Sequence, residues 1–123
     1  VVREDSRGAY FDRFNALMRE TDILWTKPSE LSFYSGLGIP IVMAPPIGPQ
    51  EDKNQLWLTD NGCALPQYSP SLALEWLEDM LKSGVFAERA LNGFIKTRRL
   101  GVYKIEELLA TGTMARETHP LRR

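Results

Sequence analysis

Apolar residues recur at helical spacing near the start of the chain, and three short apolar runs follow it. The runs cover residues 22–25, 41–44 and 63–65, and each is bounded by turn-forming residues. Short apolar runs of this kind are typical of buried parallel strands, and the third has the length of an edge strand. The helical spacing predicts an amphipathic helix near residues 8–20. Its apolar positions are Tyr10, Phe11, Phe14, Leu17 and Met18.

Helices are expected between the three strands. Pro28 suits a first helical turn, with Thr26 or Lys27 as the cap, so one helix should run from about 28 to 37. It should stop at Gly36 or Gly38, because glycine tolerates the left-handed conformation. A second helix should cover about 50–60, with acidic residues 51 and 52 near the positive end of its dipole.

The last part of the chain reads as helical throughout. Ser69 and Pro70 mark the start of a helix that ends at residues 83–84, and a further helix covers 86–95. A final helix, 102–110, places apolar residues on one side. These are Val102, Ile105, Leu108 and Leu109. Residues after Gly112 are polar and are expected to fray.

Strands that alternate with helices predict an α/β fold with a parallel sheet. We expect a partial Rossmann-like, three-layer sheet with few short strands and a helical C-terminal third. The domain should span 1–112, followed by a flexible tail at 113–123. Two or three short strands leave open edges, so either strands before Val1 are missing or a partner chain covers an edge, as in a homodimer.

Composition narrows the class of protein further. The 123 residues are 43% hydrophobic and 25% charged, an ordinary globular balance. Fifteen Lys and Arg against 16 Asp and Glu give no basic excess for broad nucleic-acid binding. The single cysteine and single histidine exclude an internal disulfide and a Cys/His zinc site. No run is long and apolar enough for a membrane span and no signal peptide opens the chain, so we expect a cytoplasmic protein, cut from something longer.

Two loops have the position in which α/β proteins bind ligands. Residues 26–30 follow the first predicted strand, and residues 45–54 follow the second. Ligands of open α/β sheets sit beyond the carboxyl ends of the strands, near helix N-termini. A diphosphate could be held there by the backbone amides of the helix that begins near Pro28.

The order of residues around these loops resembles a known family. Asp22 begins the first strand, Gly38-Ile39-Pro40 opens the second, and Pro45 and Pro46 end it. Gln50 and Asn54 follow four apart, and Gly62-Cys63-Ala64 lies eight residues past the asparagine. This order is similar to the C-terminal, donor-binding domain of B-fold glycosyltransferases. The most similar members are the bacterial lipid II-forming peptidoglycan N-acetylglucosaminyltransferases and the related diacylglycerol glycosyltransferases.

The resemblance implies a nucleotide-sugar-binding half of a glycosyltransferase, inactive alone. The donor, a UDP-sugar, would be a substrate, and no cofactor or metal is implied. The acceptor-binding domain, which usually supplies the general base and would make any membrane contact, lies outside this chain, so no catalytic residue is assigned. The substrate-binding residues implied are Thr26, Lys27, Pro28, Ser29, Glu30, Gln50 and Asn54.

Two departures from the family pattern support a different hypothesis. Lys27 stands where the family has a glycine packed against the diphosphate, and Phe33 stands where it has the glutamate that holds the ribose hydroxyls. Glu30, one helical turn earlier, could replace that glutamate only if the helix shifted. The alternative is a non-catalytic α/β binding or assembly module that has lost ribose recognition.

Overall fold

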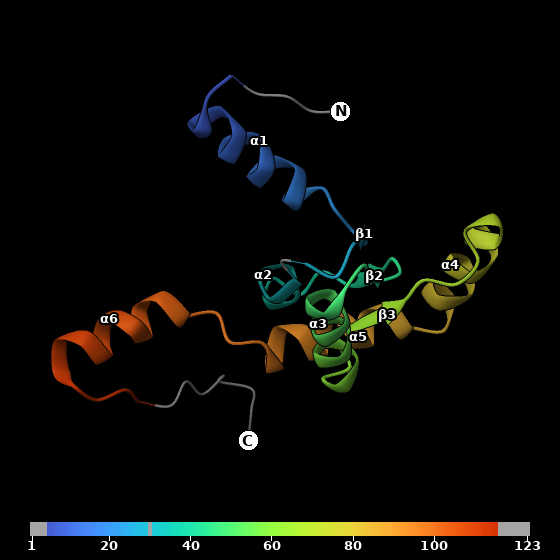
Figure 1. The fold of residues 1–123 in the computed structure, drawn as a ribbon. Coiled ribbons are helices and arrows are strands. Elements are labelled where there is room, and N and C mark those ends of the chain that lie inside the picture. Colours follow the sequence, from blue (N-terminus) through green and yellow to red (C-terminus); the bar gives the residue numbers. More distant parts are fainter. Residues whose placement is uncertain (1–4, 30, 116–123) are drawn as a thin grey trace.

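A computed structural model describes residues 5–29 and 31–115 of the chain. Three parallel strands alternate with helices, and further helices follow the last strand (Figure 1). In chain order the elements are α1 (Arg7–Arg19), β1 (Leu24–Thr26), α2 (Leu31–Gly36), β2 (Ile41–Met43), α3 (Pro49–Asp60), β3 (Ala64–Pro66), the 3-10 turn η1 (Pro70–Leu72), α4 (Ala73–Lys82), α5 (Val85–Lys96) and α6 (Gly101–Thr111).

The strand order in the sheet is β1-β2-β3, with β2 in the middle. Both pairings are parallel, and Val42 is the register partner of both Trp25 and Leu65. The expected α/β class, the parallel sheet and the helical region after the strands are confirmed. The edge position of the third strand is confirmed as well.

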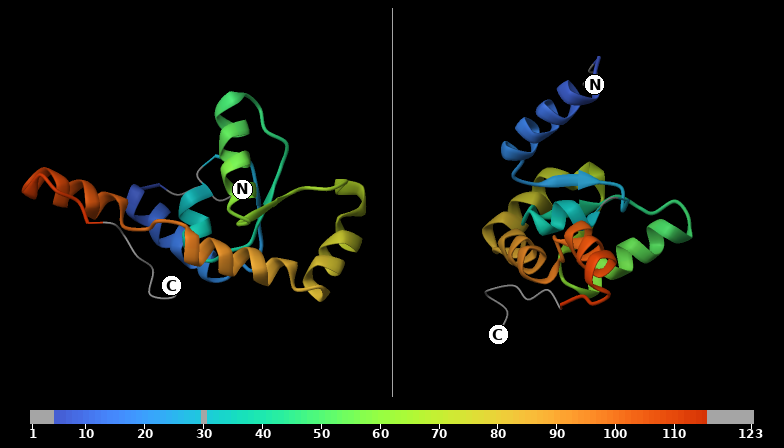
Figure 2. Two further views of the ribbon diagram at one scale, coloured as in Figure 1. Left: turned by 90° about the horizontal axis from the view of Figure 1, so that it is seen from below. Right: turned by 90° about the vertical axis from the view of Figure 1, so that its left-hand side faces the viewer.

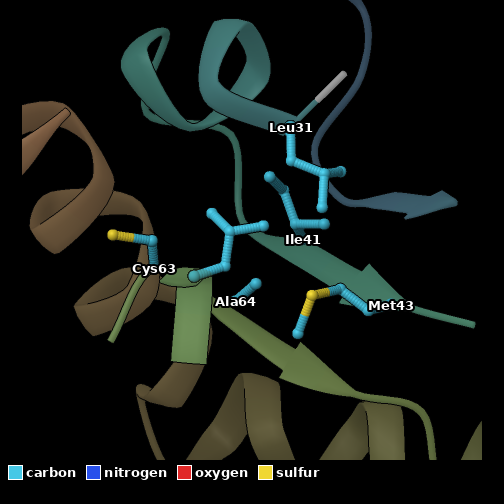
Figure 3. Packing of buried hydrophobic residues seen from close by; sticks show 6 residues of the cluster. Leu31, Ile41, Met43, Cys63 and Ala64 are labelled. Atoms are coloured by element: carbon cyan, nitrogen blue, oxygen red, sulfur yellow. The ribbon is translucent and has the colours of Figure 1, made fainter. Parts of the chain in front are cut away.

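Helices cover both faces of the sheet. Ile41, Val42 and Met43 of β2 are each 0% exposed, although alternate residues of a strand point to opposite faces. Ile41 and Met43 pack with residues of α2, α3 and β3 in the main core cluster (Figure 3), whose members are Leu31, Ile41, Met43, Leu58, Cys63 and Ala64. On the other face, Trp25 meets Trp76 of α4 with ring centroids 5.3 Å apart. The left view of Figure 2 accordingly has α3 and α5 on opposite sides of the strands.

Helices α2 and α5 cross in close contact. A Cβ atom on Gly93 of α5 would lie 2.7 Å from the backbone and side-chain oxygens of Ser35 in α2. The Ser35 hydroxyl also shares a buried hydrogen bond of 2.8 Å with the hydroxyl of Thr97. This contact fixes α2 against the helical layer that covers the Val42 face.

The second helix begins later than the sequence suggested. The expected start near Pro28 is wrong, because α2 begins at Leu31 and Thr26 is still part of β1. Residues 27–29 form a turn, in which the Ser29 amide donates to the Lys27 carbonyl over 2.8 Å. The expected continuous helix from Ser69 also differs, because η1 precedes α4 and the regular helix starts only at Ala73.

Two helices extend away from the sheet. No residue of α1 or of α6 is buried. Both helices project on the same side of the molecule, to the left in Figure 1. Phe14 of α1 contacts α2, because its ring lies 6.0 Å from that of Phe33 and 6.2 Å from that of Tyr34.

Candidate functional sites

The predicted ligand loops meet at one edge of the sheet. Thr26 ends β1 and Met43 ends β2, and these two residues are register partners. The Ala44 amide, just past β2, donates to the Thr26 carbonyl over 2.8 Å. The structure therefore brings Thr26, Lys27, Pro28 and Ser29 close to the loop that leads into α3. Glu30 lies outside the described residues.

Asn54 connects the two loops through its side-chain amide. Its Nδ2 atom lies 3.0 Å from the Pro28 carbonyl oxygen and 3.1 Å from the Ser29 carbonyl oxygen. Pro28 itself is among the most fully buried residues of the fold. The Asn54 amide thus holds the turn between β1 and α2, and both of its bonds go to protein atoms.

Lys27 lies in a second internal network. Its Nζ atom is 3.1 Å from the Pro45 carbonyl oxygen and 4.0 Å from Oε2 of Glu51. The same Glu51 oxygen accepts a hydrogen bond of 2.6 Å from the Ile47 amide. Gly48 precedes α3 at φ 104, where a residue with a side chain would be strained. These contacts therefore join the loop between β2 and α3 to Lys27 and to the first turn of α3.

The electrostatics of this edge do not favour an anion. Glu51 and Asp52 lie in the first turn of α3, where they already interact with the positive end of the helix dipole. Glu51 also lies close to the Lys27 ammonium group. Helix α2 has only six residues, so its dipole adds little. Gln50 is exposed in the first turn of α3.

A small cavity lies beside these residues. It has a volume of about 190 Å³ and is lined by Ser29, Leu31, Ser32, Asn54, Trp57 and Leu58. Cavities that hold drug-sized ligands usually measure about 300–1,000 Å³. The cavity is therefore smaller than a nucleotide-sugar requires, and only Ser29 and Asn54 of the predicted residues line it.

A different surface has more exposed apolar area and was not expected from the sequence. Five aromatic residues form what we call the aromatic surface: Tyr10, Phe11 and Phe14 of α1 with Phe33 and Tyr34 of α2. They line, together with Ser32, a cavity of about 420 Å³. Tyr10, Phe11 and Phe33 remain 55%, 58% and 52% exposed. Aromatic rings at this exposure are common in protein interfaces.

Three separate cavities have Phe33 in their lining. They are the aromatic cavity, a second cavity with Arg19 and Leu37, and a third cavity with Arg98 and Arg99. We call these three cavities together the Phe33 groove. In the part of the chain that the structure describes, its lining includes three arginines and no acidic residue. The signal in the sequence was the pairing of Phe33-Tyr34 with the aromatic run of the first helix, but helical spacing alone does not say which helices meet.

Groups typical of metal or nucleophilic chemistry are not gathered in the part of the chain that the structure describes. Those residues hold no set of three or more His, Cys, Asp or Glu side chains placed to bind a metal ion. Cys63 is buried in the core, where it packs as a small apolar side chain. His119 lies outside the described residues. Among the described helices, none is long and apolar enough to cross a membrane.

Comparison with known proteins identifies the family of this chain but assigns it no function. Searches of curated proteins and of solved structures found no match. The family model described as "Domain of unknown function (DUF6938)" matches residues 3–106, which is most of the chain. The match includes α1, the whole sheet and the first half of α6. The chain therefore belongs to the DUF6938 family.

Proposed function

We propose that this chain is a non-catalytic α/β module that binds a polypeptide through the aromatic surface between α1 and α2. The observation that carries the proposal is the exposure of Phe11 and Phe33, each more than half accessible beside a cavity of about 420 Å³. Contiguous exposed apolar surface of this kind marks interaction sites in soluble domains. Aromatic side chains contribute much of the binding energy of such interfaces.

The polar edge of the sheet supports the same proposal. Lys27 and Asn54, the two side chains best suited to contact a nucleotide-sugar, already bond to protein groups in the loops. Glu51 and Asp52 would repel a diphosphate at the start of α3. Phe33, in the place of a ribose-binding glutamate, faces Phe14 of α1. Each of these residues has a structural role without a nucleotide.

A peptide selection tests the proposed function. The 123-residue chain is offered a displayed library of random peptides, and the Phe33→Glu variant serves as the counter-target. We expect enrichment of amphipathic helical peptides with aromatic or aliphatic anchors, and weaker binding of roughly thirtyfold to the variant. Leu74→Glu, on an 81% exposed residue of α4, is the matched control and should bind like the parent. Peptides that bind the parent and Phe33→Glu equally would contradict the proposal.

The second candidate is the nucleotide-sugar-binding half of a B-fold glycosyltransferase-like protein. The adjacent positions of the loops after β1 and β2, at the carboxyl ends of parallel strands, favour it. In this proposal Thr26, Lys27, Pro28, Ser29, Glu30, Gln50 and Asn54 contact a UDP-sugar, and an acceptor-binding domain outside this chain completes the enzyme. Binding would require the Lys27–Glu51 contact to open.

Calorimetric titration with UDP-, GDP- and TDP-sugars tests the second candidate. Saturable binding that Gln50→Ala weakens would support it, because Gln50 is exposed and its removal leaves the loop network intact. Lys53→Ala, on an exposed residue of the same helix, is the control. No heat of binding at millimolar nucleotide-sugar would rule out donor binding by this chain.

A further inference from the structure

The final helix has an apolar side that the fold leaves uncovered. We call Val102, Ile105, Leu108 and Leu109 the α6 stripe; they are 68%, 59%, 44% and 81% exposed. They were expected on one side of a helix, and their helix is confirmed, but no residue of α6 is buried. A helix with one apolar side is normally stabilised by the surface that covers that side.

We propose that the α6 stripe of one chain packs into the Phe33 groove of a second copy, so that the chain forms a reciprocal dimer. This inference deepens the proposed function by naming the polypeptide partner. The groove and the stripe belong to the same chain, and Phe33 in the groove and the four residues of the stripe are all exposed. In a two-fold dimer both contacts form at once, because each chain gives its α6 to the other and receives one.

The exposed area of the chain is large enough to accommodate an interface. A compact monomer of 14.0 kDa is expected to expose about 6,700 Å². This chain exposes 9053 Å², roughly a third more than that expectation. Stable interfaces remove about 800 Å² from each partner, well within the excess. Among the described residues, α1 and α6 contain none that is buried.

The charges of the two surfaces are complementary. Arg19, Arg98 and Arg99 line the groove, and among the described residues of its lining none is acidic. Helix α6 carries Glu106 and Glu107 against the single Lys104, so it is acidic overall. Complementary charge favours this pairing over groove-to-groove contact and sets the register of the helix. Such an interface has an aromatic centre and a charged rim.

Sedimentation equilibrium of the 123-residue chain is the first test. We expect a dimer of twice the 14.0 kDa chain mass. Phe33→Glu and Ile105→Glu should each weaken the dimer by roughly thirtyfold or more, as expected of central interface residues. Leu74→Glu, on exposed α4, should leave the dimer unchanged. Circular dichroism of each variant checks that the exposed substitutions do not unfold the chain.

Cysteine cross-linking tests which surfaces meet. Phe33→Cys and Ile105→Cys chains are mixed and oxidised, while the native Cys63 stays inaccessible in the core. The mixture should form far more disulfide-linked dimer than either chain alone, because the proposed contact joins residue 33 of one chain to residue 105 of the other.

Three results would overturn the inference. They are a monomeric parent chain, a dimer that neither charged variant weakens, and equal cross-linking in the mixture and in the separate chains. Open-ended polymers would also contradict a closed, two-fold dimer. A monomer that still selects Phe33-dependent peptides would leave the proposed function standing and remove only the second copy as its partner.

Discussion

Gly93 lies where α5 crosses α2, at a distance that leaves no room for a side chain. An added methyl group would come within 2.7 Å of two oxygen atoms of Ser35, one of them in the backbone. Gly93→Ala should therefore lower the free energy of unfolding by about 1–3 kcal/mol, as overpacking does elsewhere. Urea denaturation measures the change.

The matched control for this prediction is Gly8→Ala in α1. A Cβ atom at Gly8 has no heavy atom within 4 Å, so the substitution adds helix propensity without a clash. The free energy of unfolding should stay the same or rise by at most about 1 kcal/mol. A Gly93→Ala chain as stable as the parent would mean that α2 and α5 can separate at no cost.

Asn54 is the second residue whose role can be measured directly. Asn54→Ala removes both hydrogen bonds to the carbonyls of Pro28 and Ser29. We expect the free energy of unfolding to fall by about 1–2 kcal/mol, because a part-buried carbonyl loses its donor. Gln50→Ala, exposed at the start of the same helix, should change it by less than about 0.5 kcal/mol. Equal stability of the two variants would argue against the structural role of Asn54.

These residues show what a sequence can predict at the residue scale. The burial of Cys63 follows from its apolar neighbours, and the structure confirms it. The partners of Asn54 lie 25 and 26 positions away in the chain, so no local pattern reveals them. Phe33 was identified as unusual by its place in a motif, but its contact with Phe14 depends on how α1 folds back.

At the scale of elements, α6 contains a titratable contact. Lys104 donates to Oε2 of Glu107 over 2.6 Å, and the Ala115 amide donates to Oε1 over 3.4 Å. These bonds, the lysine first, hold the pKa of Glu107 below its ordinary value of 4.5. A carboxyl with a lowered folded pKa contributes stability above its unfolded pKa and loses it as the pH falls through the folded pKa.

We therefore expect the protection of the α6 amides, measured against the intrinsic exchange rate at each pH, to decrease as the pH falls below about 4.5. Carboxyl titration by NMR should show the pKa of Glu107 rising toward its ordinary value in Lys104→Ala. Lys82→Ala removes a comparable exposed ion pair with Glu78 in α4 and should leave Glu107 unchanged. A Glu107 pKa that does not respond to Lys104→Ala would contradict the assigned cause.

The elements were predicted well where local rules dominate. The bounds of α1, α3, α5 and α6 lie within one residue of those expected, because each has a periodic apolar side or a marked start and stop. The bounds of β1 and α2 were less accurate. Pro28 fits a first helical turn, but here it lies in a turn before α2, and the side chain of Asn54 donates a hydrogen bond to its carbonyl. A hydrogen bond between residues far apart in the sequence therefore decided the conformation at Pro28, and the local preference of proline for a first helical turn did not.

At the scale of the whole molecule, assembly should appear as thermal stability. A partner that binds only the folded chain raises the midpoint of unfolding as its concentration rises. The melting temperature of the parent should therefore increase with protein concentration, whereas that of Phe33→Glu should not. Differential scanning calorimetry over a range of concentrations measures both. A parent whose melting temperature is independent of concentration would contradict the dimer.

Alternating strands and helices predicted the class of fold, because parallel strands need helical crossovers. The same pattern predicted an apolar side for both terminal helices. It did not tell which surface covers that side, since amphipathic spacing is identical for a helix packed on its own sheet and for one packed on another chain. For that reason the Phe33 groove and the uncovered α6 stripe emerged only from the structure.

The position of Cys63 allows the rate at which the core opens to be measured. It is the single thiol of the sequence, and it lies directly before β3 with 0% exposure. A thiol-reactive dye in excess can label it only when β3 and α3 separate. Each labelled molecule then records one such opening, so the labelling rate measures the lifetime of the closed core without an introduced cysteine.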